Sequence, residues 1–365
     1  MKTYSLTRVS PTIREDVRLI AQGMSDRFQG LRGKTVLVTG AAGFIGSYFL
    51  DVLAALNERG LKPLCRVIAI DNFKTGVQDR VEHLKGRKDI HFLSRDIKDP
   101  FPIEERVDFI IHTASIASPT FYRRFPLETI DTNVNGTRHL LELARRGVES
   151  MLFLSTSEIY GDPDPTHIPT GEDYRGNVSC TGPRACYDES KRLAETLCMT
   201  YHRLYDVPVK TVRPFNVYGP GLRLDDQRII PDLLSAVLNH EPIVLYSDGK
   251  ATRSFCYVRD AVQGMLYVLL SDANGEAFNV GNDEEIAIGH LAEKMADLAA
   301  PPRVTVEYRR NEDSDYLTDN PQRRQPDLRK LRSLGWVPEV NLTEGLTRTI
   351  RSYRELMKGE ASLVS

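Results

Sequence analysis

The feature that most constrains the fold of this chain is a short apolar segment that leads directly into three evenly spaced glycines. The segment Thr35–Thr39 reads TVLVT, the glycines are Gly40, Gly43 and Gly46, and a helical pattern follows over Tyr48–Leu56. Glycines allow backbone N–H groups to approach a pyrophosphate, which also lies at the positive end of the following helix. The order of strand, glycine turn and helix therefore predicts a dinucleotide-binding turn. A tight turn without a ligand is the alternative.

Apolar segments of strand length recur along the chain, and each is followed by a longer helical pattern. Continuous apolar segments are typical of parallel strands that crossover helices bury on both faces. We therefore predict an α/β fold with a doubly wound parallel sheet. The predicted strands are 35–39, 66–70, 90–93, 107–112, 150–155 and 209–212.

The character of the sequence changes after Pro214, where turns, short helices and scattered arginines replace the regular alternation. This change predicts a second, smaller lobe, and a cleft between two lobes is a common place for a ligand. We expect an N-terminal helical extension over residues 1–33, a dinucleotide-binding domain over 34–213 and a substrate-binding α/β lobe over 214–365.

The composition favours a small-molecule partner over a nucleic acid or a membrane. The 48 basic and 50 acidic side chains are mixed along the chain and give a net charge of -2, so a surface for a polyanion is not expected. No run of about 18 apolar residues occurs, as a membrane span would require. The five cysteines include no CxxC pair, which indicates neither a disulfide framework nor a metal site, and we expect a cytoplasmic protein.

Acidic residues that follow two of the predicted strands bear on the cofactor. Asp71 follows the second strand, where a carboxylate can accept hydrogen bonds from an adenosine ribose and repel a 2′-phosphate. This position favours NAD over NADP, unless Asp71 only caps the strand end. Asp96 and Ile97 follow the third strand and are candidates for contact with adenine, although Asp96 also suits a plain turn.

Tyr187 and Lys191 indicate the chemistry most clearly, because they are one helical turn apart. Side chains at i and i+4 share one face of a helix, and an ammonium near a phenol favours the phenolate, which can act as a general base. A YxxxK pair alone is also common on surface helices. Ser155, Thr156 and Ser157 strengthen the prediction, because hydroxyl groups at the end of an apolar strand can bind an alcohol that is being oxidised. Capping of a turn is the alternative.

In their order along the chain, these motifs resemble the extended short-chain dehydrogenase/reductase superfamily, over about residues 33–351. Within that superfamily the chain is most similar to the UDP-glucuronate decarboxylases. The segments that carry this resemblance are Asp71–Phe73, Ala114–Pro119, Thr132–Thr137, Ser155–Pro163, Gly182–Glu189, Phe215–Pro220 and Thr252–Phe255.

The resemblance implies a Rossmann sheet that binds NAD, and a nucleotide sugar as the substrate. The expected reaction converts UDP-glucuronate to UDP-xylose: oxidation at the sugar C4 gives a β-keto acid, which loses carbon dioxide before C4 is reduced again. Tyr187 would be the base, assisted by Thr156 and Lys191. Glu158 and Ser157 would lie beside the reacting C4 and C5 atoms.

The resemblance also assigns residues to the two ligands. The expected cofactor-binding residues are Gly40, Gly43, Phe44, Ile45, Gly46, Asp71, Asn72, Asp96, Ile97, Ala114, Ser115, Tyr187 and Lys191. The expected substrate-binding residues are Ser118, Asn216, Arg228 and Arg253. A surface position is the alternative for Arg253, where a guanidinium would otherwise suit a carboxylate or a diphosphate.

The sequence departs from the decarboxylases near the expected substrate. Arg175 replaces a Trp, residues 179–181 replace Asn-Pro-Ile, Gly221 replaces a common Arg and Ile116 a common Pro. A nucleotide-sugar 4-epimerase or 4,6-dehydratase is therefore the alternative function. Against these, Ser157 replaces the Asp that is typical of the dehydratases, and typical 4-epimerases lack the glutamate at 158. A non-catalytic NAD-binding sensor is the third hypothesis.

The superfamily usually dimerises through two helices of each subunit, which here would cover roughly residues 127–146 and 188–204. We therefore expect a homodimer. The apolar positions of these helices could also simply face the sheet.

Overall fold

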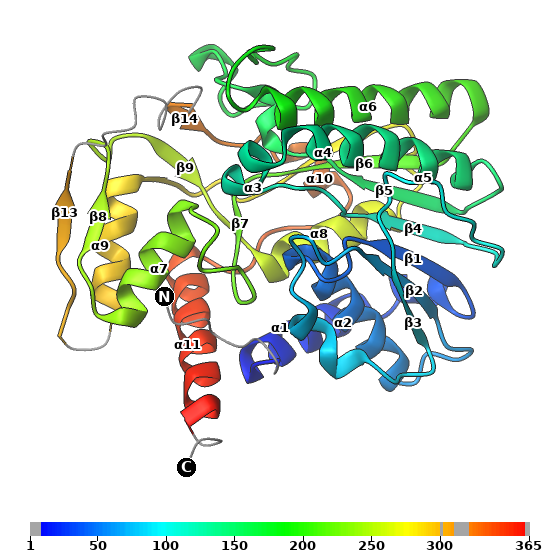
Figure 1. Ribbon diagram of the computed structural model, residues 1–365, viewed down its shortest axis with the longest axis horizontal. Coiled ribbons are helices and arrows are strands. Elements are labelled where there is room, and N and C mark those ends of the chain that lie inside the picture. Colours follow the sequence, from blue (N-terminus) through cyan, green and yellow to red (C-terminus); the bar gives the residue numbers. More distant parts are fainter. Residues whose placement is uncertain (1–8, 300–301, 310–320, 362–365) are drawn as a thin grey trace.

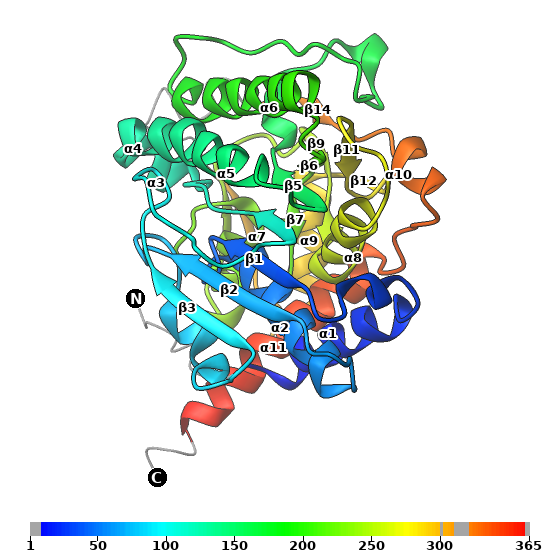
Figure 2. The same ribbon diagram turned by 90° about the vertical axis from the view of Figure 1, so that its right-hand side faces the viewer.

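A seven-stranded sheet forms the centre of the protein, in a computed structural model that describes residues 9–299, 302–309 and 321–361 (Figures 1 and 2). The strand order is β11-β6-β5-β4-β1-β2-β3, and each neighbouring pair is parallel. All the strands predicted from apolar segments are present. The sheet consists of β1 (Thr35–Thr39), β2 (Arg66–Asp71), β3 (Ile90–Ser94), β4 (Phe109–His112), β5 (Ser150–Leu154), β6 (Val209–Pro214) and β11 (Ala277–Val280).

Helices cover both faces of this sheet, as a doubly wound fold requires. Successive side chains of a strand point to opposite faces, and Val36 and Val38 accordingly join one apolar core while Leu37 joins the other. Figure 1 shows the two helical layers above and below the sheet. One layer holds α1 (Pro11–Gly23), α2 (Phe44–Glu58) and α8 (Val258–Leu269), and the other holds α3 (Pro119–Arg124), α4 (Pro126–Asp131), α5 (Thr137–Ala144) and α6 (Ala185–Tyr205).

A second lobe lies at the left of Figure 1 and contains small sheets and helices from the C-terminal part of the chain. Its elements are α7 (Ile229–Asn239), β8 (Ile243–Leu245), β9 (Thr252–Ser254), β12 (Glu285–Ala287), α9 (Ile288–Leu298), β13 (Val306–Tyr308), β14 (Arg323–Arg324) and α11 (Leu342–Ala361). The short pair β7 (Val217–Tyr218) and β10 (Cys256–Tyr257) and helix α10 (Arg329–Ser333) complete the regular structure after β6. Before β6, the short 3-10 and π-helical segments are η1 (Arg27–Leu31), η2 (Gln78–Leu84), η3 (Thr132–Gly136), η4 (Ser157–Tyr160) and η5 (Pro165–His167).

The expected boundary at residue 213 does not separate two continuous segments. After α7, β8 and β9 the chain returns to the central sheet, where α8 covers one face and β11 pairs with β6. The physical reason is that β6 would otherwise be an exposed edge strand with unpaired backbone groups. Residues 1–8 of the expected extension, and residues 300–301, 310–320 and 362–365 of the expected second lobe, lie outside the described residues.

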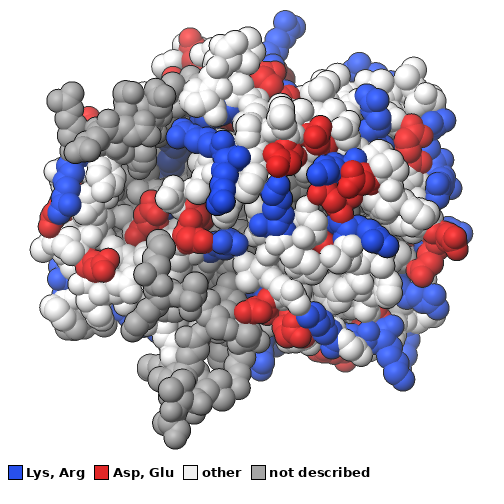
Figure 3. All heavy atoms as spheres, viewed as in Figure 1, with Lys and Arg blue, Asp and Glu red and all other residues white. Residues whose placement is uncertain are grey.

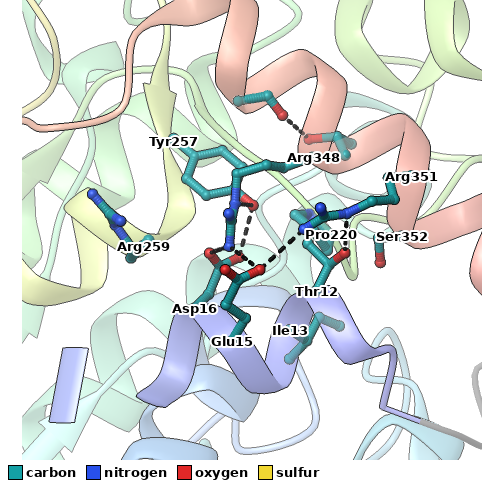
Figure 4. Close-up of polar contacts among 12 residues, drawn as sticks. Thr12, Ile13, Glu15, Asp16, Pro220, Tyr257, Arg259, Arg348, Arg351 and Ser352 are labelled. Atoms are coloured by element: carbon teal, nitrogen blue, oxygen red, sulfur yellow. Dashed lines mark hydrogen bonds and ion pairs between the residues drawn. The ribbon is translucent and has the colours of Figure 1, made fainter. Parts of the chain in front are cut away.

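Helix α1 packs against α2, α8 and α11, so the described part of the N-terminal extension belongs to the body of the molecule. Figure 4 shows the polar contacts between α1 and α11. The fully buried carboxylate of Asp16 accepts hydrogen bonds from Tyr257 Oη at 2.7 Å and from Arg348 Nη2 at 2.5 Å. Thr12 donates to Glu355, and the hydroxyls of Ser10 and Ser352 are 2.7 Å apart. These contacts tie the helix that precedes the sheet to the last helix of the chain.

Basic and acidic side chains are interspersed on the face seen in Figure 3, in keeping with the small net charge. No helix within the described ranges is both long enough and apolar enough to cross a membrane.

Candidate functional site

A cleft lies at the carboxyl ends of the sheet strands, where ligands bind in open α/β sheets. Its walls come from the turn after β1, the ends of β2, β4 and β5, the start of α6 and the loop after β6. With the exception of Arg253, every residue that we expected to bind cofactor or substrate, or to act in catalysis, lines this one cleft. These residues are Gly40, Gly43, Phe44, Ile45, Gly46, Asp71, Asn72, Asp96, Ile97, Ala114, Ser115, Ser118, Thr156, Ser157, Glu158, Tyr187, Lys191, Asn216 and Arg228.

The glycine turn after β1 is packed too closely for side chains. Gly40 has a φ of +66°, and a Cβ there would lie 2.7 Å from the backbone of Ala114. A Cβ at Gly46 would lie 2.0 Å from the carbonyl oxygen of Gly40. Helix α2 begins at the next residue after Gly43 and turns its N-terminus to the cleft. The turn therefore presents backbone N–H groups and the positive end of a helix, the arrangement that suits a diphosphate.

Asp71 lies at the cleft end of β2, and its carboxylate is tied to the glycine turn. Its Oδ2 accepts a hydrogen bond from the backbone N–H of Ala42 at 2.9 Å, and Oδ1 accepts one from that of Phe73 at 2.7 Å. Burial raises the pKa of Asp71, and these backbone hydrogen bonds oppose the rise. Asp71 thus caps the strand end and also lines the cleft. Asn72 donates to Asp96 across the same end of the cleft.

Tyr187 and Lys191 are buried together at the start of α6, against the end of β5. Lys191 Nζ donates to the carbonyl oxygen of Leu154 at 2.6 Å, and burial lowers the pKa of Lys191 to about 7. Burial raises the pKa of Tyr187 above its usual range, although a hydrogen bond with Thr156 opposes the rise. The expected lowering of the Tyr187 pKa by Lys191 is therefore outweighed, because burial dominates.

Tyr122 of α3 is a residue of the site that sequence reasoning missed. Its ring stacks on that of Tyr187, with centroids 5.2 Å apart and planes 9° apart, and it lines the cleft. The stack holds one face of the Tyr187 ring. No spacing rule in the sequence connects these two tyrosines.

Glu158 lies between two arginines that sequence reasoning also missed. Arg184 and Arg324 both form ion pairs with its carboxylate, one to each oxygen. Burial alone would raise the pKa of Glu158, but the two guanidinium charges lower it to about 2. Glu158 is therefore ionised at any physiological pH. Arg324 also donates to the carbonyl oxygen of Gly161 at 3.1 Å and so links β14 to the segment after β5.

Arg253 is buried beside this cluster but is not part of the cleft wall. Its Nη1 donates to the carbonyl oxygen of Thr252 at 2.7 Å, and its Nη2 donates to that of Pro321 at 2.5 Å. Burial lowers the pKa of Arg253 to about 10, and the charge of Arg324 adds to this effect. The structure thus brings Arg253 near Glu158 without bringing it into the cleft.

The remaining expected substrate residues lie on or beside the loop after β6. Ser118 Oγ donates to the backbone carbonyl oxygen of Asp226 at 3.3 Å, and Arg228 forms an ion pair with the side chain of Asp226. Asn216 has a φ of +40° and donates to the carbonyl oxygen of Ser254 at 2.9 Å. These contacts hold the loop across the cleft from the glycine turn.

Asn133 of η3 connects two walls of the cleft without lining it. Ser115 Oγ donates to Asn133 Oδ1 at 2.7 Å, and Asn133 Nδ2 donates to Ser190 Oγ at 2.9 Å. Because Ser190 lies between Tyr187 and Lys191 on α6, this chain of hydrogen bonds aligns that helix with the end of β4.

The glycine turn after β1 and the buried pair Tyr187 and Lys191 thus lie in one cleft of a doubly wound sheet. The NAD dependent epimerase/dehydratase family matches residues 36–281 of the chain. The chain belongs to this family. Membership establishes the Rossmann sheet and NAD as the cofactor, and the cleft residues described above fit a dinucleotide.

Individual relatives include enzymes of several activities. UDP-glucuronic acid decarboxylase 1 of Arabidopsis thaliana is 40% identical over 332 residues, which are 91% of this chain and 72% of that protein. UDP-glucose 4-epimerase of Thermotoga maritima is 26% identical with a TM-score of 0.75, covering 88% of this chain and 99% of its own. The dTDP-glucose 4,6-dehydratase DesIV of Streptomyces venezuelae, solved with NAD and TYD bound, is 28% identical with a TM-score of 0.74, covering 88% and 97%. The fold is thus shared by three chemistries, and the site must discriminate among them.

Proposed function

We propose that this protein converts UDP-glucuronate to UDP-xylose by an NAD-dependent decarboxylation through a 4-keto intermediate. The observation that carries the proposal is the Glu158 carboxylate held ionised by Arg184 and Arg324 beside Tyr187. Identity of 40% to a UDP-glucuronic acid decarboxylase over 91% of the chain supports the same reaction.

In the proposed reaction Tyr187 removes the proton from the sugar C4 hydroxyl. Thr156 shares a hydrogen bond with Tyr187 that lowers the cost of the phenolate. When bound, NAD supplies the hydride acceptor for C4 and, in its oxidised form, a positive charge that favours the phenolate. Lys191 donates to the carbonyl oxygen of Leu154 and lies beside Tyr187. It is a second group that titrates near neutral pH.

Loss of carbon dioxide needs no acid at the carboxylate, because the C4 ketone accepts the electron pair of the breaking C–C bond. A proton then adds at C5, after which the hydride would return from the reduced cofactor to C4 while Tyr187 gives its proton back to the C4 oxygen. Loss of water from C6 would instead need an acid for the departing hydroxyl, and Glu158 with a pKa of about 2 cannot donate a proton at neutral pH. The ionised state of Glu158 therefore supports decarboxylation over 4,6-dehydration.

The experiment is incubation of the purified protein with UDP-glucuronate and NAD, followed by mass spectrometry of the nucleotide sugar. The expected product has lost carbon dioxide. A product of unchanged mass would indicate 4-epimerisation, and either that result or no turnover of UDP-glucuronate would overturn the proposal. UDP-glucose and dTDP-glucose are tested in parallel, because loss of water from either would identify a dehydratase.

A homodimer in the cytoplasm completes the proposal. Large apolar side chains are exposed on the adjoining helices α4 and α6, where a second copy of the chain would cover them: Leu127, Ile130, Leu193, Leu204 and Tyr205. Scattered apolar side chains are normal on a surface, but a group on two neighbouring helices supports an interface. All five cysteines are free, which supports a reducing compartment.

A further inference from the structure

Arg80 is a buried arginine whose donors are only partly used by the protein. It lies in η2, its side chain is 3% exposed, and its Nη2 donates to Asp51 Oδ2 of α2 at 2.5 Å. Its Nε and Nη1 are buried and have no hydrogen-bond partner in the described part of the chain. Buried N–H groups of a charged side chain are costly to leave unpaired, so each such group requires an explanation.

The groups packed around Arg80 fix the position of its guanidinium but do not accept hydrogen bonds from Nε or Nη1. Asp51 is shared with His83, whose Nε2 lies 2.7 Å from Asp51 Oδ1. Burial would raise the pKa of Asp51, but Arg80 and His83 together lower it. The ring of Tyr48 lies 5.3 Å below the guanidinium. The guanidinium of Arg80 is therefore charged and oriented, and two of its N–H donors have no acceptor among the described residues.

Arg80 forms part of the cleft wall, next to the turn that faces the cofactor. Phe44, the first residue of α2, lines the same wall. Gly221 lies opposite Arg80 and has a φ of +93°. It has no side chain to cover the arginine, since a Cβ there would lie 3.5 Å from Arg80 Nε and 3.8 Å from the Phe44 ring. Tyr48 Oη donates to the carbonyl oxygen of Pro220 at 3.1 Å and so fixes this loop.

We propose that Arg80 is a diphosphate-binding residue, which donates from Nε or Nη1 to a phosphate oxygen in the cleft. A guanidinium gives charge-assisted hydrogen bonds to phosphate oxygens, and Asp51, which occupies Nη2, preorganises it for such a contact. Two ligands of this cleft carry a diphosphate, the dinucleotide and the nucleotide sugar. Proximity to Phe44 and the N-terminus of α2 favours the dinucleotide. The inference rests on nucleotide binding, and on the proposed substrate for its second source, but not on the reaction.

The test compares Arg80→Met and Arg80→Lys with the wild-type protein in binding experiments without turnover. NADH binding is followed by fluorescence without a nucleotide sugar, and UDP binding is followed by calorimetry with NAD present. We expect the Kd of at least one of these two ligands to rise about tenfold or more in Arg80→Met, because hydrogen bonds to charged groups are lost. Weaker binding of NADH alone identifies the dinucleotide as the ligand whose diphosphate Arg80 contacts. Weaker binding of UDP alone identifies the nucleotide sugar.

Adenosine and uridine, which carry no phosphate, serve as matched probes in competition experiments, and their affinities should not change. Arg80→Lys keeps a positive charge beside Asp51, so it decides the question if Arg80→Met does not fold. Arg59→Met, at the exposed end of α2, controls for the loss of one positive charge. Wild-type Kd values for both NADH and UDP in the folded variants, or an equal loss for the nucleosides, would overturn the proposal. Absence of decarboxylation would not affect it.

Discussion

Tyr187 and Lys191 lie side by side, yet burial moves their pKa values in opposite directions, up for the phenol and down for the ammonium. Both shifts have the same origin, because a low dielectric disfavours whichever form is charged. Near neutral pH the phenol of Tyr187 is therefore uncharged, whereas Lys191 is close to its pKa and only partly protonated.

Substitution Tyr187→Phe removes the proposed base without changing the ring that stacks on Tyr122. We expect kcat to fall by roughly 10² to 10⁴, the usual contribution of general acid–base catalysis, while NADH binds with wild-type affinity. Steady-state kinetics with UDP-glucuronate and NADH fluorescence check the two parts. The control is Tyr308→Phe, an exposed tyrosine of β13, and comparable kcat values for the two variants would contradict the assignment.

The lowered pKa of Lys191 predicts that the stability of the protein depends on pH, and it also gives the sign of that dependence. Between about 7 and the ordinary value of 10.5 the folded protein binds fewer protons at this site than the unfolded chain. The free energy of unfolding should therefore rise with pH across this window, by at most about 1.4 kcal/mol per pH unit from this residue, and the gain is lost as the pH falls through 7. Lys191→Met should show a flatter dependence in urea titrations at pH 7 to 10, whereas Lys250→Met, on an exposed side chain, should keep the wild-type slope.

The residues of the site that could be predicted from the sequence are those whose neighbours are local. Tyr187 and Lys191 are one turn apart, and the glycines follow their strand directly. The contacts of Glu158 with Arg184 and Arg324 span 26 and 166 residues, and no local pattern encodes them. The ionised state of Glu158 could therefore be found only in the folded protein.

Helices and strands, too, were predictable from the sequence where local residues determine them and not where distant contacts do. The strands β1 to β6 were predictable because each contains a short apolar segment of strand length, although the edge strand β3 is only partly buried. Strand β11 contributes only Ala277–Val280 and pairs with β6 after an excursion through the second lobe. Its place in the sheet follows from the need to cover the edge of β6, a tertiary effect that four residues cannot signal.

The contact between α1 and α11 predicts a large effect of a substitution far from the cleft. Asp16→Asn removes the buried charged partner of Arg348 and leaves it only the half-exposed Glu15, which should lower the free energy of unfolding by about 3 kcal/mol. The double variant Asp16→Leu/Arg348→Met should lose less, because no charge is left unpaired. Denaturant titration measures both.

The control for this pair is Glu15→Gln, which removes a half-exposed carboxylate that contacts the same arginine at 3.2 Å. Its effect should stay below about 1 kcal/mol, as for other exposed ion pairs. Equal losses for the variants at Asp16 and Glu15 would show that α1 is not held by a buried charge.

At the scale of the whole molecule, the exposed side chains on α4 and α6 predict the state of association. Leu193→Asp with Leu204→Asp places two charges among the apolar side chains proposed as the interface, where their desolvation is costly. Sedimentation should show a dimer for the wild-type protein and a monomer for this variant. Val337→Asp, exposed elsewhere, should remain dimeric. A wild-type protein that sediments as a monomer at micromolar concentration would contradict the homodimer.

The ion pair between Asp16 and Arg348 joins residues that are 332 positions apart. A ribosome releases the aspartate early in synthesis and its partner close to the end. The nascent chain must therefore complete nearly all of its translation before Arg348 can pair with this carboxylate, although α1 already has α2 and α8 to pack against. A product that stops before α11 would lack the arginine that pairs with this buried carboxylate.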